Sequence, residues 1–317
     1  GEGSVLQMCN FIGWSPQAYL METDPILIKD IKPALTGYIS ESLTLLGQSP
    51  FPDDDAIHDI RVLMKRQRAT VRLIRPLLDE ASYNREYVAG REVGRLLSSW
   101  RETSVLRKTL RELRKEHPEL FHKLKDNEKI AEMLRKPYST WEKAAEKSSS
   151  IKTIGTQLTK ALYRVRFLTL DNPDLKLLSG ELENNYLIAA RAYLDCRNNP
   201  KQELLHEFRK KSKTLLYQLW FFRPLNPSAI KTLEKKLDFL TQSLGKFNDL
   251  AQIREQTAYR YKPDNDPAMD ELAVVIRDKQ DRYLSKVWPE AYRIFCPGKR
   301  LYDLPGFRTL PDLLSVE

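Results

Sequence analysis

Apolar positions recur at helical spacing along most of this chain. In residues 57–78 they form one stripe, made of Ile57, Ile60, Met64, Val71, Ile74 and Leu78. Similar spacing predicts further helices over residues 24–47, 84–116, 119–147, 151–170, 173–196, 227–259 and 268–295, and another between Pro200 and Asn226. With only 12 glycines in 317 residues, the pattern predicts an all-α fold.

Proline and small polar residues mark the expected interruptions of these helices. Pro33 is expected to kink or restart the first helix, and Pro137 to break the helix over residues 119–147. The helix over residues 57–78 should end or bend soon after Pro76. The three consecutive serines at 148–150 predict a hinge between two halves of the chain.

A second stripe on the helix at 57–78 is entirely basic. Steps of three and four residues place on one helical face His58, Arg61, Lys65, Arg68, Arg72 and Arg75, and Arg66 adds a further cation. No acid occurs between Arg61 and Arg75, so like charges repel along the helix and reduce its stability. The stripe therefore favours an anion-binding site, with an ordinary solvated face as the alternative.

The same pattern returns 148 residues later. This offset relates His58 to His206, Arg61 to Arg209 and Lys65 to Lys213, and it relates the triplet Arg75-Pro76-Leu77 to Arg223-Pro224-Leu225. Leu216 and Trp220 replace Arg68 and Arg72, so the second stripe is shorter. The offset is too long for a solenoid period and predicts two related halves, with their motif helices about a pseudo-two-fold axis.

These motifs resemble those of the CHAD domain, the conserved histidine α-helical domain. The resemblance rests on HxxRVxxKRxRAT from His58, on HxxRKxxK from His206, which includes Lys210, and on LGKFNDL at residues 244–250. It covers about residues 24–296. It implies two pseudo-symmetric four-helix halves, about 24–148 and 149–296, and binding of long-chain inorganic polyphosphate on a basic surface and central pore. Residues 1–23 are then a cloning scar and N-terminal extension, and 297–317 a tail.

Two positions depart from the pattern of the family. Arg101-Glu102 stands where the family usually has Arg-Asp. In the second half, Leu216-Tyr217 replaces the usual Arg-Tyr pair.

Other basic residues are candidate phosphate ligands. Arg91 and Arg95 share one helical face and could join the anion site. The alternative is an ordinary exposed face, on which these arginines pair with Glu92 and Glu102. Lys246 is a candidate within LGKFNDL, where Gly245 could permit close helix packing and Asn248 and Asp249 could orient the stripe arginines or serve structure alone. A second acid-free segment, 152–170, carries Lys160, Arg164 and Arg166 as supporting charges.

The histidines admit three interpretations. In the preferred interpretation, His58 and His206 donate hydrogen bonds to an anion at a helix N-terminus, where backbone N–H groups also favour anions. Structural hydrogen bonding is the second, and metal binding or catalysis the third. No H-x-x-x-H spacing, Gly-rich phosphate loop or nucleophile motif accompanies them, so we expect no metal, no cofactor and no enzymatic activity. The alternative is an enzyme or metal-dependent protein that acts on phosphorylated small molecules.

The composition of the chain limits which classes of binding partner are expected. The net charge of +9 favours an acidic partner, and Cys9, Cys196 and Cys296 show no disulfide or zinc spacing. No apolar run reaches the roughly 18 residues of a membrane span, and the N-terminus lacks the basic segment of a signal peptide. Nucleic acid is a less favoured partner because the stripe contains no aromatic residues to stack bases. We expect a cytoplasmic protein, with association with polyphosphate granules.

Overall fold

The structure, a computed structural model, describes residues 31–48, 51–135, 141–170, 175–259 and 266–308. Its α-helices are α1 (Ile31–Leu46), α2 (Asp54–Leu73), α3 (Glu80–Leu96), α4 (Ser98–Glu116), α5 (Pro118–Lys123), α6 (Glu128–Leu134), α7 (Trp141–Arg166), α8 (Leu175–Asn198), α9 (Gln202–Leu219), α10 (Pro227–Tyr259) and α11 (Pro267–Phe295). Short 3-10 turns are η4 (Arg75–Leu77), η5 (Trp220–Phe222) and η6 (Leu301–Asp303). The described residues contain no strand, which confirms the all-α prediction.

Three predictions lie outside the described residues. They are the N-terminal extension, the start of the first helix near residue 24, and the break at Pro137. Pro33 lies inside the first turn of α1, where a proline disrupts no intrahelical hydrogen bond.

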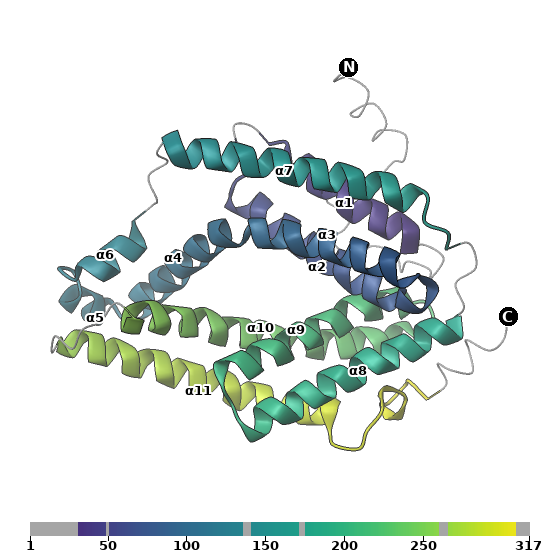
Figure 1. The fold of residues 1–317 in the computed structure, drawn as a ribbon. Helices are drawn as coiled ribbons and strands as arrows, with labels where there is room; N and C mark the ends of the chain where they lie inside the picture. Colours follow the sequence, from purple (N-terminus) through teal and green to yellow (C-terminus); the bar gives the residue numbers. More distant parts are fainter. Residues whose placement is uncertain (1–30, 49–50, 136–140, 171–174, 260–265, 309–317) are drawn as a thin grey trace.

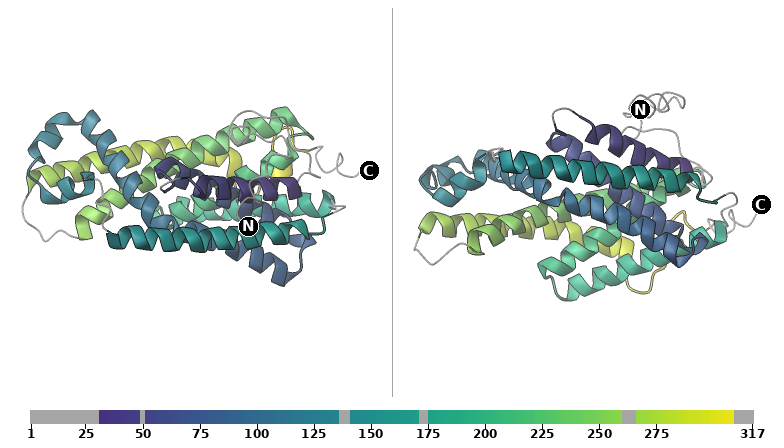
Figure 2. Two further views of the ribbon diagram at one scale, coloured as in Figure 1. Left: turned by 90° about the horizontal axis from the view of Figure 1, so that it is seen from above. Right: turned by 45° about the horizontal axis from the view of Figure 1, so that its top comes forward.

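The two helices that carry the repeated motifs, α2 and α9, lie inside an elongated helical assembly (Figure 1). On one side α1 packs against α7, and both lie over α2 and α3. On the other side α8 and α9 pack together, and α10 packs along both α9 and α11. At the far end, α4, α5 and α6 meet the ends of α10 and α11, as the two further views also show (Figure 2). None of the described helices is long and apolar enough to span a membrane.

Two hydrophobic cores hold this assembly together. The larger core extends in sequence from Ile31 to Phe307, and it includes the fully buried Ile60 of α2 and Phe208 of α9. The smaller core fills the far end and combines Leu110 of α4 with Leu272 of α11. Because burial of each such side chain contributes roughly 1.5–3 kcal/mol, the apolar faces of α2 and α9 fix which way their basic faces point.

The helix predicted over residues 84–116 is two helices. The chain turns at Leu97, whose side chain is fully buried and whose N–H donates to the carbonyl oxygen of Val93 at 3.3 Å. Apolar spacing continues on both sides of this turn, so periodicity alone did not reveal it. The helix predicted to reach residue 78 also ends early, at Leu73, and η4 carries Pro76.

The hinge predicted at the three serines is wrong. Residues 148–150 lie inside α7, which continues from Trp141 to Arg166. Serine is only slightly less favourable than alanine in a helix, by about 0.5 kcal/mol. The buried Ile154 and Leu158 on the following turns of α7 belong to the larger core, so packing outweighs this small cost.

Candidate anion-binding site

The start of α2 is occupied by acids, and this changes the interpretation of the histidines. Asp53 caps the helix by accepting a hydrogen bond from the backbone N–H of Ala56 at 2.7 Å, and Asp54 and Asp55 fill the first turn. His58 lies beyond that turn and is exposed, while His206 lies four residues after the start of α9. The prediction that both histidines occupy a helix N-terminus is therefore wrong.

Five cations from α2 and α9 gather where these two helices pack together. We call them the central cluster: Arg61, Lys65, Arg68, Arg209 and Lys213. The positive charges that act most strongly on Lys65 are the other four members. A buried hydrogen bond from Nε2 of Gln218 to the carbonyl oxygen of Ala69, at 2.9 Å, joins the two helices nearby in sequence. The packing of α2 against α9 thus brings Arg61 and Lys65 close to their counterparts Arg209 and Lys213.

The motif arginines are oriented by backbone carbonyls. Nη1 of Arg61 donates to the carbonyl oxygen of Gly94 at 2.6 Å and to Oγ of Ser98 at 2.9 Å. Nε of Arg209 donates to the carbonyl oxygen of Thr241 at 3.0 Å. The two acceptors follow their arginines by 33 and 32 residues, nearly the same spacing. A carbonyl has no formal charge, so these bonds orient each guanidinium without neutralising it.

Lys65 has the most unusual environment in the cluster. Burial, together with the positive charges of Arg209 and Arg61, lowers its pKa to about 7. No acid among the described residues forms an ion pair with it. Lys213 differs, because its Nζ lies 3.0 Å from Oδ1 of Asp238, although burial still lowers its pKa. The centre of the site is thus a partly sheltered concentration of positive charge.

His206 lies beside this cluster. Burial, followed by the charges of Lys210, Arg209 and Lys65, lowers its pKa below the ordinary value. Its Nδ1 is buried without a hydrogen-bond partner among the described residues. Nowhere among the described residues do three His, Cys, Asp or Glu side chains gather closely enough to hold a metal ion.

Aromatic rings from a neighbouring helix lie beside the basic stripe, although the stripe itself contains none. The guanidinium carbon of Arg75 lies 5.0 Å from the ring centre of Tyr83, and that of Arg72 lies 5.4 Å from Tyr87. Nη2 of Arg72 also donates to the Tyr87 hydroxyl at 3.1 Å. The prediction considered only residues on α2, whereas these tyrosines come from α3. The absence of aromatics is therefore no longer an argument against nucleic acid.

Tyr217 of α9 joins the two motif helices at a second point. Cζ of Arg66 and Nζ of Lys213 lie 5.7 and 5.6 Å from the centre of its ring. This tyrosine follows Leu216 at the position that departs from the pattern of the family. Arg66 thus lies off the main stripe and contacts the other motif helix.

Of five further candidates, four have acidic partners and one has a side chain beyond the described ones. Nζ of Lys246 lies 2.8 Å from Glu112, and its pKa is raised chiefly by that hydrogen bond. Arg91 and Arg95 are exposed on α3 and both pair with Glu92. Lys210 is exposed and pairs with Glu207. Arg101 lies on α4, but its side chain is outside the described ones. These pairings favour the alternative of solvated, paired faces for Arg91, Arg95, Lys210 and Lys246.

Gly245 was considered for helix packing, and the structure shows what a side chain there would meet. A β-carbon at Gly245 would lie 3.2 Å from Nε and Nη2 of Arg209. The missing side chain therefore makes room for a motif arginine. This role depends on residues 36 positions apart, so the heptapeptide alone did not reveal it.

Gly245→Ala is expected to weaken anion binding several-fold because it displaces the Arg209 guanidinium. The control is Gly180→Ala on α8, since a β-carbon at Gly180 would meet nothing within 4 Å. Isothermal titration with long-chain polyphosphate checks both variants. Equal affinities in the two variants would show that Gly245 does not position Arg209.

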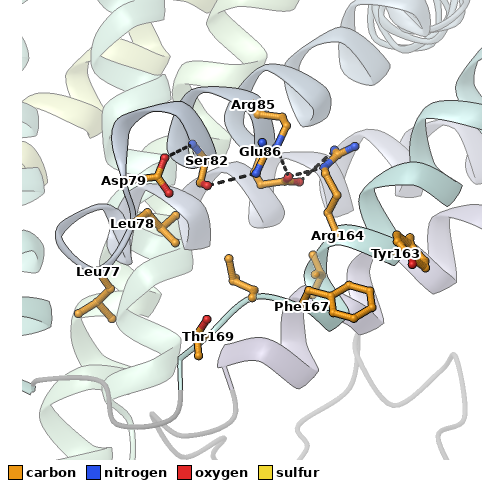
Figure 3. A pocket seen from close by; sticks show the side chains of 12 residues that line it. Leu77, Leu78, Asp79, Ser82, Arg85, Glu86, Tyr163, Arg164, Phe167 and Thr169 are labelled. Carbon is orange, nitrogen blue, oxygen red and sulfur yellow. Dashed lines mark hydrogen bonds and ion pairs between the residues drawn. The ribbon is translucent and has the colours of Figure 1, made fainter.

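A separate cavity of about 300 Å³ lies between η4, the start of α3 and the end of α7 (Figure 3). Its walls combine the exposed rings of Tyr163 and Phe167 with the buried carboxylate of Glu86. Arg85 and Arg164 both pair with that carboxylate. None of the described lining residues belongs to the central cluster, and both arginines of the cavity already have an acidic partner.

The comparison with protein families agrees with the motifs. A family model for the CHAD domain matches residues 45–258. A crystal structure of the CHAD domain from the plant Ricinus communis is 15% identical in sequence, with 96% of each chain covered and a TM-score of 0.45. No curated protein matches the chain.

Proposed function

The chain belongs to the CHAD-domain family, and from this premise we propose that it binds long-chain inorganic polyphosphate without catalysing a reaction on it. The observation that carries the proposal is the central cluster. Two helices separated by 148 residues of sequence direct five cations to one place, and no described acid pairs with the lysine at its centre. Such an arrangement costs folding free energy unless an anion binds there.

A polymer of phosphates matches the extent of the charge better than a single phosphate. The stripe from His58 to Arg75 covers 18 residues, and the 17 steps between its ends span roughly 25 Å at about 1.5 Å per residue. Arg72 and Arg75 continue it beyond the central cluster and are supported by the tyrosines of α3. A polyphosphate chain carries a negative charge on every unit, so it can contact the central cluster and the outer arginines together. Association with polyphosphate granules in the cytoplasm belongs to the same proposal.

Affinity is expected to rise with polyphosphate chain length and then level off. A short chain contacts only part of the stripe, while a longer chain gains further contacts at a high effective concentration. Binding should also weaken strongly with salt, because the protein displaces condensed counterions from the polyanion. Titration with a series from pyrophosphate upward, at fixed total phosphate and two salt concentrations, checks both expectations. Arg72→Gln with Arg75→Gln removes the charges beyond the central cluster, so it should flatten the length dependence and leave short-chain binding nearly unchanged.

The same titration separates the alternatives. Tighter binding of pyrophosphate or a nucleotide than of long chains would contradict an extended surface and favour a protein that acts on small phosphorylated molecules. Tighter binding of single-stranded DNA than of polyphosphate at equal salt would favour nucleic acid, for which Tyr83 and Tyr87 offer rings. Sustained phosphate release from polyphosphate that is lost in His206→Ala would show an enzyme.

A further inference from the structure

Building on the proposed function, we propose that the central cluster takes up a proton at Lys65 when a phosphate polymer binds, so that acidification strengthens binding. The site would then respond to pH as well as to polymer. The reason lies in which members of the cluster can release a proton when the site is empty.

Lys65 is the member best able to relieve the repulsion within the empty cluster. Arg61, Arg68 and Arg209 stay protonated, because a guanidinium does not deprotonate in the physiological range. Lys213 is compensated by Asp238 of α10, which lies 3.0 Å away. Lys65 lies one helical turn from both Arg61 and Arg68 on α2, and α9, which carries Arg209 and Lys213, packs against α2. Lys65 has no ion-pair partner among the described acids. Loss of its proton is therefore the least costly way to lower the charge of the empty site.

The pKa of Lys65 agrees with this geometry. Burial and the surrounding cations lower it to about 7, so above pH 7 the amine of the free protein is largely neutral. A bound polyanion adds negative charge beside the amine and raises its pKa toward the ordinary value. Between these two values the bound protein holds more protons than the free protein. Affinity must then fall as pH rises above 7, by up to about tenfold per pH unit for one proton.

The other titratable groups around Lys65 act in different pH ranges. From α9, His206 faces the cluster, and its lowered pKa places its titration below its ordinary value of 6.5. Tyr217, also on α9, has its pKa raised by burial, so it stays protonated near neutrality. From α2 the neighbours are Arg61 and Arg68, and from α10 Asp238 acts through its pair with Lys213. The pH interval from 7 to 9 thus excludes His206 and Tyr217, and replacement of Lys213 by arginine separates Lys65 from the second buried lysine, whose pKa is also lowered by burial.

Calorimetry in buffers of different ionisation enthalpy tests the inference. The full chain is titrated at pH 8 with long-chain polyphosphate, because terminal phosphates titrate near pH 6 and are few in a long chain. The wild-type protein is expected to take up close to one proton per bound site. Lys65→Arg retains the positive charge but cannot release it, so it should bind polymer with almost no proton uptake and little change in affinity between pH 7 and 9.

Two matched variants serve as controls. Lys213→Arg makes the same change at the lysine that Asp238 compensates, and His206→Gln removes the imidazole, so each should retain most of the proton uptake at pH 8. Polymer binding without proton uptake by the wild-type protein would overturn this inference and leave the proposed function standing. No polymer binding at any pH from 6 to 9 would overturn both. Full proton uptake by Lys65→Arg would assign the proton to another group and also overturn the inference.

Discussion

Simultaneous replacement of Arg61 and Arg209 by glutamate is expected to lower the affinity for long-chain polyphosphate by at least about 100-fold. Each arginine supplies charged hydrogen-bond donors to the site, and one such bond contributes about 1.5–3 kcal/mol. Loss of two therefore removes about 3–6 kcal/mol, and each 1.4 kcal/mol corresponds to a tenfold change. The two new carboxylates also repel the polymer and pair with Lys65. Titration at fixed salt measures the loss.

The matched control reverses the same number of charges elsewhere. Lys115, at the end of α4, and Lys125, after α5, are both exposed and lie among acids. Their replacement by glutamate changes the net charge equally and should cost less than about threefold. Equal losses in the two double variants would show that net charge alone determines binding. Thermal unfolding of both variants checks the fold, since Arg61 and Arg209 also hold backbone carbonyls.

Arg164→Leu is expected to destabilise the folded protein by about 3 kcal/mol. Nη2 of Arg164 lies 3.1 Å from Oε2 of Glu86, and Nε contacts the other carboxylate oxygen, so one bidentate pair links α7 to α3. The side chain of Glu86 is only 6% exposed. Removal of Arg164 therefore leaves a buried carboxylate without its main partner, and this costs far more than the pair contributes. Equilibrium unfolding in urea measures the change.

Arg85→Leu provides the comparison, because Arg85 pairs with the same carboxylate. Nε of Arg85 lies 3.3 Å from Oε1 of Glu86, but the arginine side chain is 54% exposed. An exposed ion pair contributes about 0–1 kcal/mol, so this variant should unfold almost like the wild-type protein. If both variants lose the same stability, burial does not distinguish the two arginines. Polyphosphate binding should survive in both, since neither belongs to the central cluster.

The sequence was most informative where the structure is locally determined. The steps of three and four from His58 to Arg75 identified a helix with an apolar and a basic face, and the offset of 148 identified its counterpart. Burial of Ile60 and Phe208 sets the rotation of α2 and α9, so the apolar pattern predicted which residues of each helix face away from the core. It did not predict which cations of the two helices lie together. The apolar faces therefore carried most of what could be known about the site.

Contacts between elements that are distant in the chain could not be predicted from the sequence. Asp238 follows Lys213 by 25 residues and compensates it, whereas nothing in the local pattern of Lys65 reveals that it has no such partner. The tyrosines beside Arg72 and Arg75 lie on the next helix. Arg164 looked like a supporting anion ligand until the structure paired it with Glu86, 78 residues earlier. In each case tertiary packing decides whether a charge is available, and a single-sequence pattern does not contain that information.

The continuity of the larger core has a consequence for anyone who would divide the protein. The repeated motifs invite a cut near the middle of the chain, to obtain two small modules with one basic helix each. Yet that core unites side chains from Ile31 to Phe307, and α7 runs unbroken through the obvious cleavage point. Either fragment would expose the apolar surface that the other half now covers. It would also retain the cluster cations of only one helix, α2 or α9. The sequence contains two copies of the motif, but we expect neither half to fold on its own.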